Sequence, residues 1–205
     1  AGGGGGNDEG SLSGGGGGAG GSGSYASCTV SVEPGQTLSV TVGKGGPGGN
    51  GGGSGKYKDG INADDGEHSF VGVPKPWKTL VNGGPGHAGR GGEGSGAFQS
   101  GYGMYGGSGG VKGATDCQGT APVLHVGNDG AKGEDGYRNA PGRGGLGGET
   151  PVPVKQCDGL LGLNGSGGGG GHGAGNQGDF SGGHQEPSTA GKNGKNGCVV
   201  LTYTA

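Results

Sequence analysis

The chain has 205 residues, of which 68 are glycine, while hydrophobic residues make up 25% and charged residues 14%. Glycine is ordinarily about 7% of a globular protein, so this composition excludes an ordinary core of amphipathic helices or long sheets. The net charge of -3, from 13 basic and 16 acidic residues spread thinly, indicates neither nucleic acid nor an anionic membrane as a partner. We also expect no membrane insertion, because no stretch approaches about 18 consecutive apolar residues.

Glycine recurs at every third position in separate blocks along the whole chain, from Gly14 to Gly191, Gly194 and Gly197 near the end. A period of three matches neither the α-helix nor the strand, but it is the repeat of polyproline II geometry. Collagen shares the glycine content but needs strict Gly-X-Y periodicity and at least about 15–20% proline. This chain has 10 prolines, irregularly placed. We therefore expect a bundle of short polyglycine II helices whose backbone groups bond across to neighbouring helices.

A small antiparallel β-sheet is expected beside the bundle. Within residues 28–42, two segments alternate apolar and polar residues with period two, and Pro34-Gly35 between them suits the centre of a type II turn. This pattern predicts a hairpin over residues 28–42, and residues 198–203 predict a third strand that joins it. The predicted fold class is mainly irregular and β, without an α-helix. We expect one domain over residues 1–205, the C-terminal or mature part of a longer chain.

The four cysteines show no Cys-x-x-Cys or Cys/His spacing, which favours two disulfides over a zinc site. Disulfides indicate a location outside the cytosol. Three connectivities are open. We favour Cys28 with Cys198, because this bridge would join the hairpin to the third strand, and that choice leaves Cys117 with Cys157.

One acidic segment is a candidate calcium site, because clustered oxygen ligands on a loop suit that cation. The spacing is not that of an EF-hand, and the alternative, which we favour, is a solvated polar turn. No cofactor is expected apart from this candidate calcium ion. The candidate ligands are Asp59, Asp64, Asp65 and Glu67.

Motifs for catalysis are not found in the sequence. No glycine-rich stretch continues into the Gly-Lys-Ser/Thr of a phosphate-binding loop, and the five histidines lack paired ligand spacing. A chain with so little apolar material has few means of shifting pKa values for acid–base chemistry. We expect that the protein is not an enzyme.

The segments between the glycine blocks hold nearly all the aromatic residues, and we expect them to project as irregular loops from a rigid bundle. Exposed tryptophan and tyrosine on loops suit stacking and hydrogen bonding to a sugar or a protein receptor. The alternative is that several aromatics are buried as plugs at the ends of the bundle. The candidate receptor-binding residues are Trp77, Phe98, Tyr102, Met104 and Tyr105.

Three stretches carry a resemblance to a known family: the Ala-Gly start, the segment SCTVSVEPGQTLSVTVGKGGPGG at 27–49, and GKNGCVVLTY at 194–203. The chain resembles the glycine-rich domains at the ends of bacteriophage tail fibres. Its alternation of glycine blocks and irregular segments is similar to the tip adhesins of T-even-like phages. The resemblance implies a polyglycine II sandwich whose loops bind a host receptor. It also implies a β-strand before Ala1, supplied by an upstream part of the chain or by a neighbouring chain.

Our first functional hypothesis is a non-catalytic extracellular adhesin that displays aromatic loops to a cell-surface receptor or glycan. The alternative is an extracellular structural protein that polymerises into filaments with other copies of itself, through glycine faces or a donated strand. An ice-binding protein is a third hypothesis, but the threonines show no regular period. We expect the protein to be secreted or to lie on a virion or cell-surface appendage, since four cysteines are more than a phage part assembled in the cytosol would carry.

Overall fold

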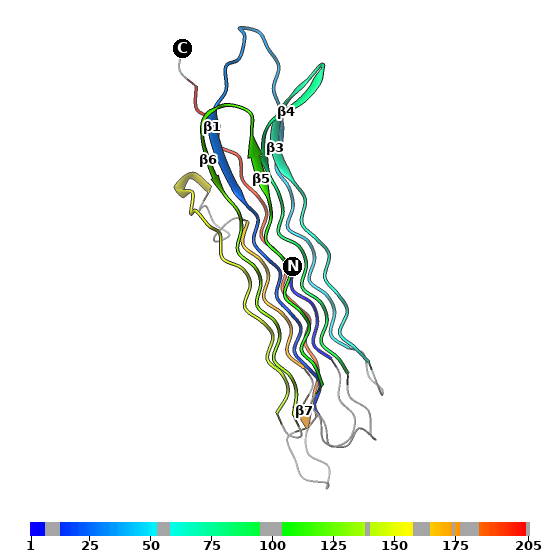
Figure 1. Ribbon diagram of the computed structural model, residues 1–205. Helices are drawn as coiled ribbons and strands as arrows, with labels where there is room; N and C mark the ends of the chain where they lie inside the picture. Colours follow the sequence, from blue (N-terminus) through cyan, green and yellow to red (C-terminus); the bar gives the residue numbers. More distant parts are fainter. Residues whose placement is uncertain are drawn as a thin grey trace.

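The protein is an elongated bundle of extended chain runs with most of its short β-strands at one end (Figure 1). This computed structural model describes residues 1–6, 13–52, 58–94, 104–137, 140–157, 165–173, 175–176 and 185–203. Within these residues, backbone hydrogen bonds join ten extended runs that pass up and down the long axis. We number them run 1 (1–6), run 2 (13–24), run 3 (43–52), run 4 (58–68), run 5 (84–94), run 6 (104–114), run 7 (127–136), run 8 (141–149), run 9 (165–173) and run 10 (187–197).

The hydrogen bonds of run 2 confirm polyglycine II geometry. Three successive N–H groups, those of residues 15, 16 and 17, donate to runs 5, 7 and 9 respectively. The next three N–H groups repeat this order of partners, and so do the three after them. A repeat of three residues per turn is that of the polyproline II helix. Each turn therefore bonds to three different neighbours.

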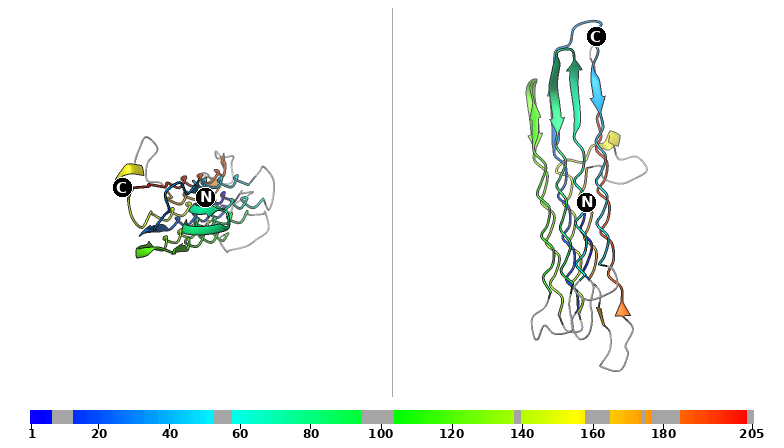
Figure 2. Two further views of the ribbon diagram at one scale, coloured as in Figure 1. Left: turned by 90° about the horizontal axis from the view of Figure 1, so that it is seen from above. Right: turned by 90° about the vertical axis from the view of Figure 1, so that its right-hand side faces the viewer.

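The same bonds arrange the runs in three layers. Runs 4, 5 and 6 form one outer layer, runs 10, 9 and 8 form the other, and runs 3, 1, 2 and 7 lie between them. The view along the bundle shows this flat, layered section (Figure 2). Runs 1 and 2 each bond to six neighbouring runs. They are the centre of the fold, and their described residues from Ala1 to Ser22 are buried.

Close packing of backbones explains the glycines. A Cβ atom on Gly3, Gly17 or most other glycines of the runs would lie well inside 3.0 Å of a neighbouring backbone atom. The central runs need glycine on all sides and consist of almost uninterrupted glycine. In run 3, on the rim, Gly43, Gly46 and Gly49 are buried while the residues after each of them are exposed. In runs 1 to 3, the number of sides on which a run is packed thus matches its glycine spacing.

The strands extend some of the runs and form three antiparallel sheets. One has the order β2-β3-β4-β5, another pairs β1 with β6, and a third pairs β7 with β8. Among the described residues there is no α-helix, and no helix has the length and apolar composition needed to cross a bilayer. The elements are β1 (Tyr25–Thr29), β2 (Ser39–Thr41), β3 (Ser69–Pro74), β4 (Trp77–Gly83), β5 (Thr115–Cys117), β6 (Thr120–His125), the short 3-10 helix η1 (Lys155–Cys157), β7 (Gly175–Asn176) and β8 (Gln185–Glu186).

The structure confirms the mainly irregular and β fold class but contradicts the predicted hairpin over residues 28–42. The turn itself is present, because the Gln36 N–H donates to the Glu33 carbonyl at 3.0 Å and Gly35 has a φ of 82°. The two strands nevertheless diverge: β1 pairs with β6, and β2 pairs with β3. Run 1 lies between run 2, which leads into β1, and run 3, which follows β2, so the two strands cannot meet.

The predicted third strand is also wrong. Residues 198–203 continue run 10 past the bundle but pair with no described strand. Run 10 bonds to runs 1, 3 and 9 and not to run 2, which keeps this C-terminal segment apart from β1 in the hydrogen-bonding network.

The bundle has two chemically different ends. We call the end with β1 to β6 and residues 198–203 the strand end (Figure 1). At the opposite end, Gly15 bonds to Gly6 and Glu93, and Glu93 in turn bonds to Tyr105. We call it the loop end, because the described residues on either side of 7–12, 53–57, 95–103 and 138–139 lie there, as does β7.

Candidate functional site

The strand end encloses a cavity of about 940 Å³, which we call the strand-end cavity. Ala1 lies among its lining residues, with β1, β3, β4 and the C-terminal segment. Most of its bulky side chains are apolar. Val32 is 50% exposed and Leu201 is 55% exposed, so the walls of the cavity are open to solvent. Apolar lining residues include Val32, Leu38, Phe70, Val81, Val154 and Leu201.

A cross-strand row of apolar residues supports one wall of the cavity. Val71 of β3 lies opposite Val40 of β2 and opposite Val81 of β4, and Val81 lies opposite Cys117 of β5. Directly opposed residues of an antiparallel pair share one face of the sheet. Val71 is only 5% exposed, which makes it one of the few buried apolar side chains. The row thus places Val71 and Val81 side by side in the wall of the cavity.

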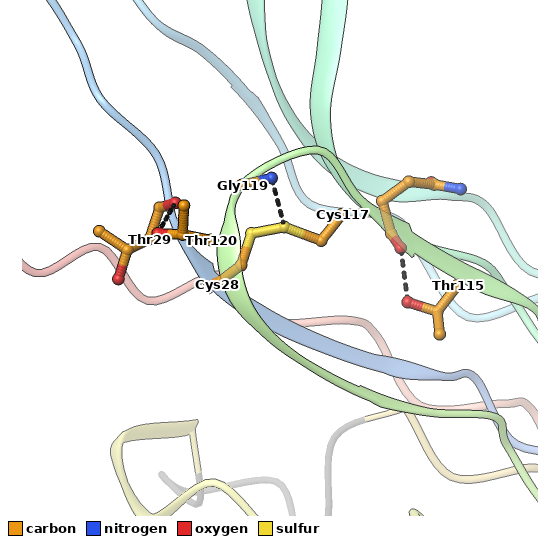
Figure 3. The surroundings of a disulfide bond; sticks show 7 residues. Cys28, Thr29, Thr115, Cys117, Gly119 and Thr120 are labelled. Atoms are coloured by element: carbon orange, nitrogen blue, oxygen red, sulfur yellow. Dashed lines mark hydrogen bonds between the residues drawn. A yellow bond between two sulfur atoms is a disulfide. The ribbon is translucent and has the colours of Figure 1, made fainter.

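Two disulfides tie the strand end together, and both differ from the pairing we predicted. Cys28 bonds to Cys117, and Cys157 bonds to Cys198. Figure 3 shows the first bridge between β1 and β5, with the Gly119 N–H donating to the Cys117 sulfur at 3.2 Å. All four cysteines are thus in disulfides, as expected, and this is compatible with an extracellular protein.

The order of the runs explains why the predicted pairing fails. Cys28 follows run 2 and Cys117 follows run 6, and runs 2 and 6 are direct neighbours. Cys198 follows run 10, which neighbours run 9, and Cys157 in η1 lies shortly before run 9 in the chain. Run 10 does not touch run 2, so Cys28 and Cys198 are not brought together.

The structure separates the predicted receptor-binding residues instead of gathering them. Trp77 lies at the strand end, 58% exposed, with its ring 5.6 Å from that of Phe70. Tyr105 lies at the loop end and is 62% exposed, whereas the adjacent Met104 is only 6% exposed. The remaining two candidates, Phe98 and Tyr102, lie outside the described residues.

A second exposed tyrosine accompanies Tyr105 at the loop end. Tyr137 is 66% exposed and directly follows Gly136, whose N–H bonds to the Met104 carbonyl. The Lys132 ammonium lies 6.0 Å from the Tyr105 ring centroid and 3.0 Å from Asp135. We call Tyr105, Tyr137 and Lys132 the loop-end aromatic patch. Nothing in the sequence distinguished Tyr137 from the other tyrosines, because its exposure depends on where run 7 ends.

Asp135 has a structural role beneath this patch. Its carboxylate accepts a hydrogen bond from the Gly106 N–H at 2.8 Å and forms an ion pair with Lys132. The Gly106 hydrogen bond is the main cause that holds the pKa of Asp135 below its usual value, Lys132 lowers the pKa further, and partial burial opposes both.

The predicted calcium ligands are not assembled as a metal site. Within the described residues, no three histidine, cysteine, aspartate or glutamate side chains are placed to hold an ion together. Asp59 and Asp65 instead accept hydrogen bonds from backbone N–H groups of run 5, and Asn62 between them does the same. Glu67 accepts from the Lys44 N–H at 3.3 Å, and Asp64 is exposed on the rim.

The electrostatics of Asp65 follow from this arrangement. Partial burial raises the pKa of Asp65, but hydrogen bonds from the Ala88 N–H and from His87 outweigh it, so the pKa lies below its usual value. The His87 Nδ1 and Asp65 Oδ2 atoms are 2.8 Å apart. The carboxylate is thus occupied by protein partners.

Rim residues of this kind recur, and sequence reasoning missed them. Asn193 and Asn196 of run 10 accept hydrogen bonds from the N–H groups of Gly48 and Gly45 in run 3. Rim runs have N–H groups that face no further run, and an Asn or Asp side chain on the adjacent run supplies the acceptor. The signal was present in the sequence as a spacing of three between these side chains.

Comparison with known proteins bears on the whole chain. The family described as "Glycine-rich domain" matches residues 1–204. The chain belongs to this glycine-rich domain family. No curated protein matches it significantly. The membership agrees with the layered glycine bundle described above, and it leaves the partner of the domain to be inferred from the structure.

Proposed function

We propose that the protein is a non-catalytic extracellular binding module, in which the glycine bundle displays the loop end to a cell-surface receptor or glycan. The observation that carries the proposal is the pair of exposed tyrosines, Tyr105 and Tyr137, at the loop end, where run 6 begins and run 7 ends. Runs 6 and 7 are hydrogen-bonded to each other and to their neighbours there. Binding residues are commonly placed on loops that a rigid scaffold positions.

The loop-end aromatic patch supplies suitable chemistry. Tyr105 and Tyr137 expose amphipathic rings, and Lys132 adds a cation beside one of them. Tyrosine offers a rigid apolar face and a hydroxyl, which suit stacking and hydrogen bonding to a sugar or a peptide. We assign these residues, with Phe98 and Tyr102 in the adjoining connection, to receptor binding.

The outer faces of the bundle favour this role over ice binding. In the middle of one face, the exposed positions of run 5 are His87, Arg90 and Glu93, which are long and polar. An ice-binding face needs regularly spaced small residues. The extracellular location rests on the two disulfides.

The test compares the two ends of the same molecule. Purified protein is labelled and its binding is measured on a glycan array and on intact cells. Tyr105→Ala and Tyr137→Ala should each weaken binding by roughly 30-fold, the effect of losing a hot-spot residue of about 2 kcal/mol. Trp77→Ala is the matched control, because Trp77 is similarly exposed at the strand end. Loss of binding in the Trp77 variant alone, or in none of the three, would contradict the proposal.

A further inference from the structure

The strand-end cavity continues the axis of run 1 beyond Ala1. Ala1 is only 3% exposed and lies at its floor. The lining includes residues from all six runs that surround run 1, among them Gly21, Gly46, Gly66, Gly86 and Gly194. These six neighbours extend past Ala1 toward the strand end, whereas run 1 stops there. The cavity therefore has the position and the surroundings of one further stretch of the central run.

Three hydrogen-bond donors along this axis have no partner among the described residues. In run 3, the Gly52 and Gly49 N–H groups donate to Gly5 and Gly2 of run 1, and the next N–H in the series, that of Gly46, donates to no described residue.

Two other neighbours repeat the pattern. In run 5, Gly92 and Gly89 donate to Gly4 and Ala1, and Gly86 donates to none of the described residues; in run 9, Gly171 donates to Gly3, and Gly168 has no described acceptor. Gly46, Gly86 and Gly168 are all buried. A buried N–H group without a partner is costly and rare, and here three point to one missing strand of acceptors.

Glycines along the same axis lack the backbone contact inside 3.0 Å that glycines beside run 1 have. On run 2, Cβ atoms on Gly17 and Gly20 would meet the Gly3 and Ala1 carbonyls well inside 3.0 Å, but a Cβ on Gly23 would have no neighbour closer than 3.3 Å.

The other two glycine series end in the same way. The run 4 series that begins with Gly60 reaches Gly66, whose nearest contact would be 3.2 Å away, and the run 10 series from Gly191 reaches Gly194, at 3.6 Å. Elsewhere in the bundle, glycine at such positions is needed because another backbone passes. Gly23, Gly66 and Gly194 continue these series, but no backbone passes within 3.0 Å of where their Cβ atoms would be.

We infer that the strand-end cavity is filled by polypeptide that continues N-terminally from Ala1, first as a further stretch of polyglycine II and then as an apolar strand. The register follows from the existing ladders. Gly168, Gly46 and Gly86 would donate to the carbonyls of the first, second and third residues before Ala1.

The residue chemistry of the occupant follows from its surroundings. Residues 21–24 separate Gly20, which lies beside Ala1, from the start of β1 at Tyr25. The four residues before Ala1 therefore lie inside the bundle and must be glycine or similarly small. Those before them lie among Val32, Phe70 and Leu201 and should be apolar on the inward side. Burial also lowers the pKa of the Ala1 α-amino group, which suits a peptide nitrogen better than a charged amine.

The experiment adds a defined probe to the full chain. One protein starts at Ala1, a second carries four glycines preceded by Val-Thr-Val-Thr-Val, and a third carries the same strand with four valines in place of the glycines. Amide hydrogen exchange is followed at each glycine. The glycine-containing extension should slow exchange at Gly46, Gly86 and Gly168 by at least about tenfold, as newly closed hydrogen bonds do. The valine version should leave these three amides unchanged, and Gly49 and Gly89 should be protected in all three proteins.

A pair of matched variants separates filling of the cavity from general stabilisation. A Cβ atom on Gly194 would meet no backbone inside 3.0 Å in the chain that starts at Ala1, whereas a Cβ atom on Gly191 would. Gly194→Val should leave the Tm of that chain nearly unchanged but cancel the gain from the extension, and Gly191→Val should lower the Tm of both chains.

Two results would overturn the inference. One is equal exchange at Gly46, Gly86 and Gly168 with and without the extension. The other is protection of these amides in the chain that starts at Ala1, rising with protein concentration together with dimers in size-exclusion chromatography, which would make a second copy the occupant. Neither result depends on receptor binding, so the outcome is independent of the proposed function.

Discussion

The α-carbon of Gly4 faces the backbone of Asn50 so closely that a Cβ atom there would lie well inside 3.0 Å of the Asn50 carbonyl oxygen. Gly4 belongs to the fully surrounded run 1, and every described residue of that run is buried. The contact shows why glycine is obligatory in the centre of the bundle. It is a matter of space rather than of φ, because Gly35 and Gly165 are the only described glycines with positive φ.

Adding one methyl group to run 1 should therefore lower the free energy of unfolding substantially. Gly4→Ala is expected to cost about 3 kcal/mol or more, since the backbones on both sides must move. Gly169→Ala is the matched control, because a Cβ there has only the Gly145 oxygen near it, at 3.5 Å. That change should raise stability by about 0.4–1 kcal/mol by restricting the unfolded chain. Urea denaturation measures both, and similar losses in the two variants would refute the packing argument.

The two disulfides should differ in their contribution. Cys28–Cys117 closes 89 residues and Cys157–Cys198 closes 41. Replacing either pair by serine should cost about 2–5 kcal/mol, and loop-closure entropy makes the first loss larger by roughly 0.7 kcal/mol. Urea denaturation of the two double variants gives the comparison. Peptide mapping without reduction should recover Cys28 linked to Cys117, and a peptide that links Cys28 to Cys198 would contradict the structure.

The stability that Asp135 contributes should depend on pH. Its pKa is lowered in the folded protein, chiefly by the Gly106 N–H and also by Lys132, so the contribution is fully present above the unfolded-state pKa, about 3.9. It is lost as the pH falls through the lower folded-state pKa. Asp135→Asn keeps an acceptor for Gly106 but cannot ionise. The stability difference between the native protein and this variant should therefore shrink from pH 6 to pH 2 in urea titrations, and a constant difference would argue against the assignment.

The rim asparagines should act as caps for unpaired N–H groups. Asn193→Ala removes the acceptor of the Gly48 N–H and is expected to cost about 0.5–1.5 kcal/mol. Asn193→Asp retains an acceptor and should cost less. Asn50→Ala is the control, because the Asn50 side chain bonds to no other described residue. Thermal unfolding of the three variants is the measurement, and an equal loss in the Asn50 variant would show that the cap is not responsible.

The repeating parts of this fold could be predicted from the sequence because they rest on local spacing. Glycine at every third position predicts polyglycine II, and Pro34-Gly35 predicts the turn that the structure contains. The even number of cysteines without metal spacing predicts two disulfides, and both are present. Consecutive glycines alone do not mark the centre, because run 9 in an outer layer also has five in a row, at 167–171. The spacing of Asn193 and Asn196 was an equally local signal that went unread.

The partners of each segment were decided by the tertiary structure alone. Residues 28–42 contain a correct turn and two strand segments, yet these do not pair, because run 1 lies between the runs that they extend. The disulfide pairing and the separation of Trp77 from Tyr105 follow from the same order of runs. A period of three says that a run packs against neighbours but not which ones, because glycine faces are chemically identical. By itself, the sequence determined that each run is an extended polyglycine II helix that packs against others. The tertiary structure decided which runs are neighbours, because only the connections and the shape of the whole bundle distinguish one glycine face from another.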